Sequence, residues 1–232
     1  MDFSPEGPMA IPLWVNGRAF LTVGDAFFDV VNPATGEAIR RVPLCGADEA
    51  AEAVGAARAA QPGWAEMGVN ARRVCLGQLA DALDNYAGHF AKLLIPETGF
   101  TEARAQAEVG AAVDALRGFA VGDTGVVAIV VDASRPLAGF AAAAAPALIA
   151  GASVVVKPSP KAPSAIYALC ELSARAEWPA GVLNLVQGDS AAIAGLCAAD
   201  IDRLLYVGEA ALGEQVGAIA ATAGKPFVSV AA

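Results

Sequence analysis

The chain is predicted to be an α/β protein built on an open, mostly parallel five-stranded sheet with helices on both faces. Two observations predict this class. After residue 120, five short aliphatic runs alternate with four apolar stretches at helical spacing, a pattern typical of strands that are buried on both faces and joined by crossover helices. Before that point, short strand patterns and then long helical patterns occur, which predicts a small N-terminal β segment followed by a helical layer.

The first part of the chain is expected to hold a flexible tail over residues 1–12 and then several short strands. Asn16-Gly17 is a strong signal for a two-residue turn between short strands. Phe27–Val31 and Ala38–Pro43 are further strand candidates, and the turn between them contains Pro and Gly, which fix a chain reversal. Two or three strands are therefore predicted before any helix.

Three helical patterns follow these strands. The first starts near Asp48, which is well placed as an N-cap. The longest is predicted over Ala71–Leu94, and Pro96 is expected to end or interrupt it. The third covers Thr101–Ala120. The apolar stripe of the long helix is expected to comprise Val74, Leu76, Leu79, Leu83, Phe90 and Leu93.

The α/β core occupies residues 121–232, and we expect it to form a single unit with residues 13–120. Its strands are predicted at Gly125–Val131, Ser153–Val156, Val182–Val186, Leu204–Val207 and Phe227–Val230. Its helices are predicted at Ala138–Ala150, Ser164–Ala176, Ala191–Ala199 and Ala211–Ala221. Because the five strands alternate with four helices, the strands are expected to run mostly parallel.

The composition excludes several classes of partner. The formal net charge is −9, whereas nucleic acid and anionic membranes attract clustered Lys and Arg. No stretch of roughly 18 uninterrupted apolar residues occurs, and the N-terminus lacks the pattern of a secretory signal. We therefore expect a cytoplasmic protein that binds neither nucleic acid nor membrane. Reduced thiols and no metal site are expected, because no C-x-x-C spacing occurs among Cys45, Cys75, Cys170 and Cys197.

Four motifs follow one another in order along the chain. They are Val31-Asn-Pro-Ala-Thr-Gly-Glu37, Val-Val-Val-Lys-Pro-Ser with its proline at Pro158, Gly181-Val-Leu-Asn-Leu-Val-Gln-Gly-Asp189 and Val207-Gly-Glu-Ala-Ala-Leu-Gly213. Together they resemble the aldehyde dehydrogenase superfamily. The resemblance runs from about Leu13 to the last residue and covers the family's N-terminal helices and its Rossmann-like cofactor domain. In that family a second domain, about as long again, supplies the nucleophilic cysteine.

The resemblance implies a vestigial NAD(P) site at Lys157, Gly208 and Gly213. Lys157 matches the family's lysine at the adenosine ribose, on the sheet edge where such ligands bind; the alternative is a solvated lysine at a strand end. The two glycines match the family's GSxxxG turn, but Glu209 stands at the serine position of that turn. A carboxylate there repels phosphate and favours a helix that caps its own N-terminus. Pro160 replaces the carboxylate that grips the ribose. The expectation is therefore no cofactor, or NAD(P) with weakened affinity.

The resemblance implies no catalytic residue in this chain. Ser134 stands where the family has the asparagine of its oxyanion hole, and losing such a donor typically costs on the order of 100-fold in rate. Ala231 aligns with the general-base glutamate and cannot move a proton. The cysteines are expected to be buried as small hydrophobes. His89, the one histidine, has no evident Ser or Cys partner.

A further departure from the family concerns assembly. Phe119–Gly125 makes, in a few residues, the connection in which the family inserts a strand-forming flap that builds dimers. This puts the family's usual dimer mode in question. Because the departures at Ser134, Pro160 and Glu209 lie well upstream of Ala232, the chain is expected to be naturally short rather than clipped.

The predicted function is that of a pseudoenzyme, a non-catalytic aldehyde dehydrogenase-like protein that serves as a binding, assembly or regulatory partner. Without a catalytic domain the cofactor domain would expose apolar surface, so a protein partner or self-association is expected there. The alternatives are a residual NAD(P)-binding module and half of an aldehyde dehydrogenase completed in trans by a separate catalytic chain. A groove above Lys157 that is filled by side chains would exclude the cofactor.

Overall fold

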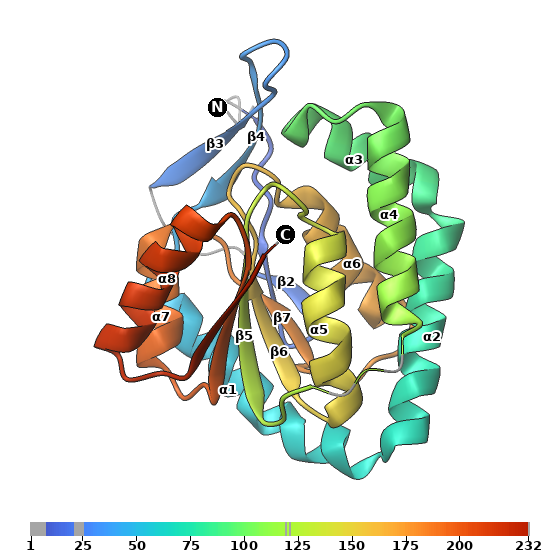
Figure 1. Ribbon diagram of the computed structural model, residues 1–232, viewed down its shortest axis with the longest axis vertical. Coiled ribbons are helices and arrows are strands. Elements are labelled where there is room, and N and C mark those ends of the chain that lie inside the picture. Colours follow the sequence, from blue (N-terminus) through green and yellow to red (C-terminus); the bar gives the residue numbers. More distant parts are fainter. Residues whose placement is uncertain (1–7, 21–25, 119, 121, 232) are drawn as a thin grey trace, which may run out of the picture.

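The computed structural model describes residues 8–20, 26–118, 120 and 122–231. Within these residues the central sheet has seven strands. Their order is β2-β1-β7-β6-β5-β8-β9 (Figure 1). The five predicted core strands pair in parallel and are β5 (Val126–Val131), β6 (Ser153–Lys157), β7 (Leu183–Leu185), β8 (Arg203–Gly208) and β9 (Phe227–Ala231). The predicted α/β class with an open, mostly parallel sheet is thereby confirmed.

Two N-terminal strands extend the sheet beyond the five strands predicted. β1 (Leu13–Val15) pairs antiparallel with β7, with Trp14 opposite Leu185, and β2 (Arg18–Phe20) pairs antiparallel with β1. All three residues of β1 are buried. A strand that is buried along its whole length needs neighbours on both faces, which is why this segment joins the sheet instead of preceding it as a separate unit.

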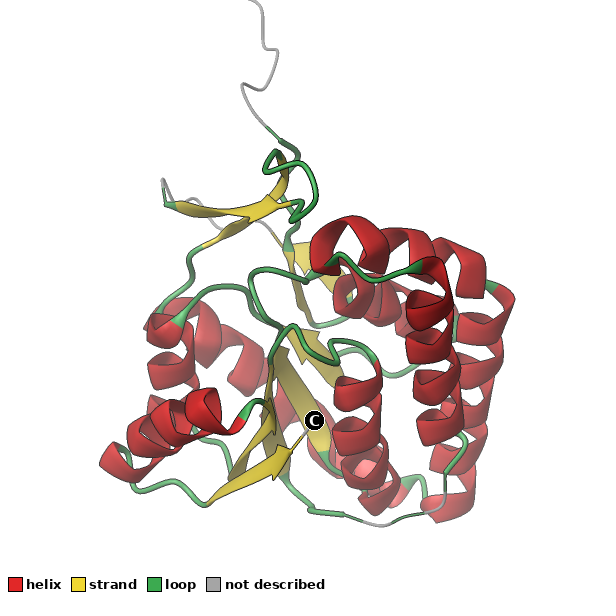
Figure 2. Ribbon diagram, turned by 45° about the horizontal axis from the view of Figure 1, so that its top comes forward, coloured by secondary structure: helices red, strands yellow, loops and turns green. Residues whose placement is uncertain are grey.

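A second hairpin stands apart from this sheet. β3 (Phe27–Val31) and β4 (Ala38–Pro43) form a two-stranded antiparallel sheet with the predicted bounds. Figure 2 shows this hairpin outside the main body of helices. The Ile11 N–H donates to the Arg41 carbonyl at 2.8 Å, so the end of the segment expected to be a tail is held against β4. Residues 1–7 of that segment lie outside the described residues.

Helices cover both faces of the sheet (Figure 1). One face packs against α1 (Ala47–Glu66), α7 (Ser190–Ala198) and α8 (Ala210–Thr222). The other face packs against α5 (Ala138–Ala150) and α6 (Ser164–Arg175). An outer layer on α5 and α6 consists of α2 (Val69–Asn85), α3 (Ala87–Thr98) and α4 (Glu102–Leu116). None of the helices in the described ranges has both the length and the apolar character that a membrane span needs.

Two helix ends differ from the predicted positions. α1 begins after Gly46, not Asp48, because the Glu49 carboxylate accepts a hydrogen bond from the Gly46 N–H at 2.9 Å and so satisfies that end of the helix. α4 begins after Thr101, which acts as its N-cap, and ends at Leu116, earlier than predicted. Side-chain caps therefore decide where these helices begin.

The prediction of one long helix over residues 71–94 is wrong. The chain leaves helical geometry at Tyr86 (φ −102°, ψ 14°), where α2 ends and α3 begins. This break lets α3 turn away from α2 and pack against α6. Pro96 lies inside α3 and does not end it. Val74 is 60% exposed and does not belong to the buried apolar stripe predicted for this helix.

Two buried glutamates attach the outer layer to the helices on the sheet. Glu108 of α4 is 8% exposed, and its carboxylate accepts the N–H groups of Leu137 (3.1 Å) and Ala138 (2.8 Å) where α5 begins. Glu97 of α3 accepts the N–H of Ser164 at 3.1 Å and also its hydroxyl, where α6 begins. Burial raises the pKa of Glu97 to about 7, although the Ser164 bonds oppose the shift. A carboxylate at a helix N-terminus satisfies unpaired donors and the helix dipole together.

Glu108→Ala is expected to lower the free energy of unfolding by about 2–3 kcal/mol, because two buried N–H groups lose a charged acceptor. Urea denaturation measures the change. Asp114→Ala, an exposed acid on the same helix, is the matched control and is expected to change stability by less than about 0.5 kcal/mol. Equal losses in both variants would show that the Glu108 cap contributes nothing specific.

Candidate functional site

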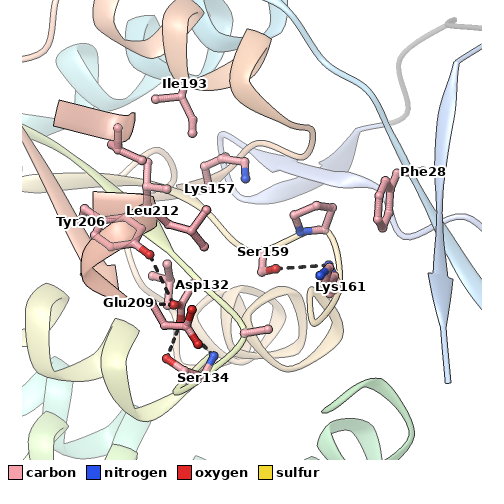
Figure 3. Close-up of a pocket in the computed structure, with 15 residues that line it drawn as sticks. Phe28, Asp132, Ser134, Lys157, Ser159, Lys161, Ile193, Tyr206, Glu209 and Leu212 are labelled. Atoms are coloured by element: carbon pink, nitrogen blue, oxygen red, sulfur yellow. Dashed lines mark hydrogen bonds between the residues drawn. The ribbon is translucent and has the colours of Figure 1, made fainter. Parts of the chain in front are cut away.

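An open cavity of about 490 Å³ lies at the carboxyl ends of β5, β6 and β8 (Figure 3). Ligands of open α/β sheets bind at this edge. The β3–β4 hairpin contributes Phe28 to one wall, and α7 and α8 contribute Ile193 and Leu212 to another. Its remaining walls are the strand ends and the loops that follow β5 and β6. The groove above Lys157 is therefore not filled by neighbouring side chains.

Lys157, the last residue of β6, lies in this cavity and is 4% exposed. Figure 3 shows its side chain between Leu212 and Phe28. The alternative of a solvated lysine is therefore wrong. Among the described residues, none accepts a hydrogen bond from the Lys157 amine and none forms an ion pair with it. Burial lowers the pKa of Lys157 to about 8, and the charge of Asp189 opposes this shift.

Asp132 is the most densely bonded polar residue at the strand ends. It follows β5 directly and is 8% exposed. One carboxylate oxygen accepts the Ser134 N–H at 2.8 Å and the Ser134 hydroxyl. The other accepts the Glu209 N–H at 2.7 Å and the Tyr206 hydroxyl at 3.3 Å. Burial and the Asp132 carboxylate raise the pKa of Tyr206. Asp132 thus ties the end of β5 to β8 and to the turn that leads into α8.

Close packing explains why Gly208 and Gly213 carry no side chain. A Cβ on Gly208 would overlap the carboxylate of Asp132. A Cβ on Gly213 would lie 2.7 Å from the Ser229 Oγ and 3.1 Å from the Tyr206 ring, so the absent side chain lets α8 approach β8 and β9. The expectation that Glu209 caps α8 itself is wrong, because its side chain makes no capping bond and Asp132 accepts its N–H instead. A phosphate placed at this turn would meet that carboxylate.

Two positions that the resemblance associates with catalysis, Ser134 and Ala231, lie just after β5 and at the end of β9. The Ser134 hydroxyl donates to Asp132 and is not directed into the cavity as a free donor. Ala231 ends β9, in register with Gly208 of β8. Pro160 lines the cavity where the family has a carboxylate. His89 is exposed on α3, edge to face with Phe90.

The cysteines behave mainly as the sequence predicts. Cys45, Cys170 and Cys197 are buried, and Cys75 is half-buried. Burial raises the pKa of all four thiols, that of Cys45 to about 12. A thiol must ionise to act as a nucleophile, so none of these cysteines is an activated one.

Sequence reasoning missed Asp132 and Tyr206 as members of this site. One signal was present, because Asp132 directly follows the wholly apolar run that forms β5. A polar residue at the carboxyl end of such a strand lies at the ligand edge of the sheet. Tyr206 carried no comparable signal within an aliphatic strand. Lys157, Gly208 and Gly213 do meet at one sheet edge, although only Lys157 lines the cavity.

The aldehyde dehydrogenase family pattern matches residues 21–122 and 123–230 of this chain. Succinate-semialdehyde dehydrogenase [NADP(+)] GabD of Escherichia coli (strain K12) is 30% identical over 227 residues, which cover 87% of this chain and 47% of that protein. N-succinylglutamate 5-semialdehyde dehydrogenase of Caulobacter sp. (strain K31) is 36% identical over 205 residues, 79% of this chain and 42% of that protein.

Solved structures agree with these relatives. Lactaldehyde dehydrogenase from Escherichia coli superposes with a TM-score of 0.89 at 26% identity, covering 96% of this chain and 52% of that chain. Aldehyde dehydrogenase C from Pseudomonas syringae, in a complex with NAD+ and octanal, gives a TM-score of 0.84 at 27% identity, covering 95% of this chain and 50% of that chain. This chain thus spans about half the length of the relatives it matches.

Lys157→Met is expected to raise the free energy of unfolding at pH 7 by up to about 3 kcal/mol. Below its folded-state pKa of about 8, Lys157 is charged while buried, whereas the unfolded chain keeps its lysine charged up to about 10.5. The buried charge therefore lowers the free energy of unfolding of the wild type by its full amount below pH 8. This cost disappears as the pH rises toward 10.5. Denaturation of both proteins across this range measures it. Lys161→Met, at an exposed lysine nearby, is the matched control and is expected to change stability at pH 7 by less than about 0.5 kcal/mol.

Proposed function

Because this chain belongs to the aldehyde dehydrogenase family, we propose that it is a non-catalytic member that acts as a binding or assembly partner through strand β9. The single observation that carries the proposal is the exposed apolar face of that strand. Because the chain spans about half of the relatives it matches, their own reactions are not assigned to it.

β9 lies at an edge of the sheet and pairs only with β8 among the described strands. On one side of β9, α8 approaches closely, since the half-buried Phe227 ring lies against Gly217 and the Ser229 Oγ lies near Gly213. On the other side Val228 is 38% and Val230 is 46% exposed. These valines line a cavity of about 290 Å³ together with Val207 and part of α5. Exposed edge strands with apolar faces favour pairing with another chain.

A second copy of this chain is the partner that we propose first. Two identical edge strands can pair antiparallel about a twofold axis, so each contributes the same surface. The pairing would continue the sheet and place Val228 and Val230 of each copy over apolar side chains. The unpaired backbone groups of β9 would gain hydrogen bonds in the same step.

The arrangement at the turn from β8 into α8 supports the non-catalytic part of the proposal. A dinucleotide diphosphate at the β8–α8 turn would have to displace or neutralise the Asp132 carboxylate, which accepts the Glu209 N–H. The Ser134 hydroxyl is already committed to the same carboxylate. The residues at this turn therefore do not fit a diphosphate bound in the usual way, and we derive no hydride transfer.

A residual NAD(P) site is the second candidate function. The observation that favours it is the Lys157 side chain in the open cavity, at the position that resembles the family's ribose lysine. One relative is named for NADP(+), and one similar structure holds NAD+. Completion in trans by a separate catalytic chain ranks third, because it requires this same cofactor site.

Val230→Lys is expected to weaken self-association by at least about tenfold, because each interface would bury two additional charges. Sedimentation velocity over a concentration series measures the dissociation constant. Val74→Lys makes the same substitution at an exposed valine of α2 and should leave the constant unchanged. Two results together would exclude β9 as the binding surface. The wild-type chain would be monomeric at every concentration reached, and in a pull-down it would capture the same proteins as the Val230→Lys variant.

Calorimetric titration with NADH or NADPH is expected to give no saturable heat up to about 1 mM for the wild type. The physical reason is the carboxylate at the β8–α8 turn. Saturable binding that is lost in Lys157→Met and retained in Lys161→Met would instead establish the second candidate. The result at β9 does not depend on this titration, so the two candidates are tested separately.

A further inference from the structure

We propose that Lys157 is a nucleophilic lysine that forms imines with small aliphatic aldehydes entering the cavity at the carboxyl edge of the sheet. This goes beyond the proposed binding function, which makes no use of the Lys157 amine. The proposal rests on where the lysine lies, on what surrounds its amine and on the nature of the cavity walls.

The geometry places the amine at the end of a rigid element. Lys157 is the last residue of β6, which is buried along its whole length and paired with β5 and β7. The residue is 4% exposed, yet it lines an open cavity of about 490 Å³. Figure 3 shows no dashed hydrogen bond at its nitrogen. A lysine held in this way keeps its amine available to a molecule that enters the cavity.

Charged residues line the cavity or lie beside it. Asp132 follows β5, Lys161 follows β6 and Glu209 precedes α8, while Asp189 caps α7. Asp132 is engaged by Ser134, Tyr206 and Glu209, and among the described residues no carboxylate is within ion-pair distance of the Lys157 amine.

Burial favours the form of Lys157 that attacks carbonyl groups. It lowers the pKa of the amine to about 8, while the charge of Asp189 opposes the shift. At neutral pH the neutral amine is then on the order of 100-fold more abundant than in an exposed lysine. Lysines activated by desolvation in an apolar pocket are a recurring device for imine formation.

The walls indicate the class of carbonyl compound. Phe28, Ile193, Leu212 and Val216 line the cavity and come from the β3–β4 hairpin, α7 and α8. Such walls stabilise an unbranched alkyl chain by burial. A neutral aliphatic aldehyde can therefore reach the Lys157 amine with its chain against these side chains.

The proposed reaction balances without a further reactant. The Lys157 nitrogen lone pair attacks the aldehyde carbon, and a proton moves from nitrogen to the new alkoxide to give a carbinolamine. Loss of the hydroxyl group together with the second nitrogen proton releases one water and leaves a C=N double bond. No electron is transferred, so neither an oxidant nor a reductant is required. The imine is reversible and is trapped for detection by cyanoborohydride, which delivers hydride to its carbon.

The test is reductive labelling of the full chain with hexanal and sodium cyanoborohydride, followed by peptide mass spectrometry. The chain has four lysines, Lys92, Lys157, Lys161 and Lys225. Lys92 and Lys161 are exposed, so labelling governed by exposure would favour them over the buried Lys157. We expect the opposite, with Lys157 labelled at least about tenfold faster at pH 7.5. Its rate should level off above about pH 8.

Lys157→Arg and Lys161→Arg are the matched variants. Lys157→Arg keeps a cation but cannot form an imine, and it should remove the fast labelling. Lys161→Arg should retain it. Labelling in denaturant should reduce the Lys157 rate to that of the other lysines, because the advantage depends on the folded cavity. The proposal is overturned if the native chain is labelled in proportion to exposure, or if Lys157→Arg is labelled as fast as the wild type.

Discussion

Carboxylates supplied by other parts of the chain hold the beginnings of several helices, and the architecture around the sheet depends on them. Glu108 binds the N-terminus of α5, Glu97 that of α6, and Asp132 the turn into α8. Each bond joins elements that are distant in sequence. Buried helix ends need such acceptors, since an unpaired N–H away from water is strongly unfavourable. The outer helical layer is thereby fixed to the helices that cover the sheet.

The same arrangement controls what the carboxyl edge of the sheet can bind. Free helix N-termini at such an edge attract phosphate, but the carboxylate of Asp132 already takes the Glu209 N–H at the turn that resembles a phosphate-binding one. Lys157 and the exposed Lys161 are the positive groups that line the cavity, and no described carboxylate pairs directly with Lys157. At this edge the structure places a buried amine at the end of β6 and a carboxylate at the turn into α8.

The two faces of the sheet are covered unequally near β9. α8 packs closely on one face because Gly213 and Gly217 let it approach Ser229 and Phe227. The opposite face, with Val228 and Val230, is not covered by a described helix. This asymmetry, and not the chemistry of the cavity, is the structural basis of the proposed role in binding.

By itself the sequence determined the α/β class, the strand and helix order of the core and the family resemblance, because hydrophobic periodicity and turn residues are local signals. It also placed Lys157 at the ligand edge. Only the tertiary structure decided that β1 joins the sheet, that the helix predicted over residues 71–94 breaks at Tyr86, and that Asp132 bonds to the α8 turn. These features depend on contacts between residues far apart in the chain, and no local pattern encodes which buried donor a given carboxylate will reach.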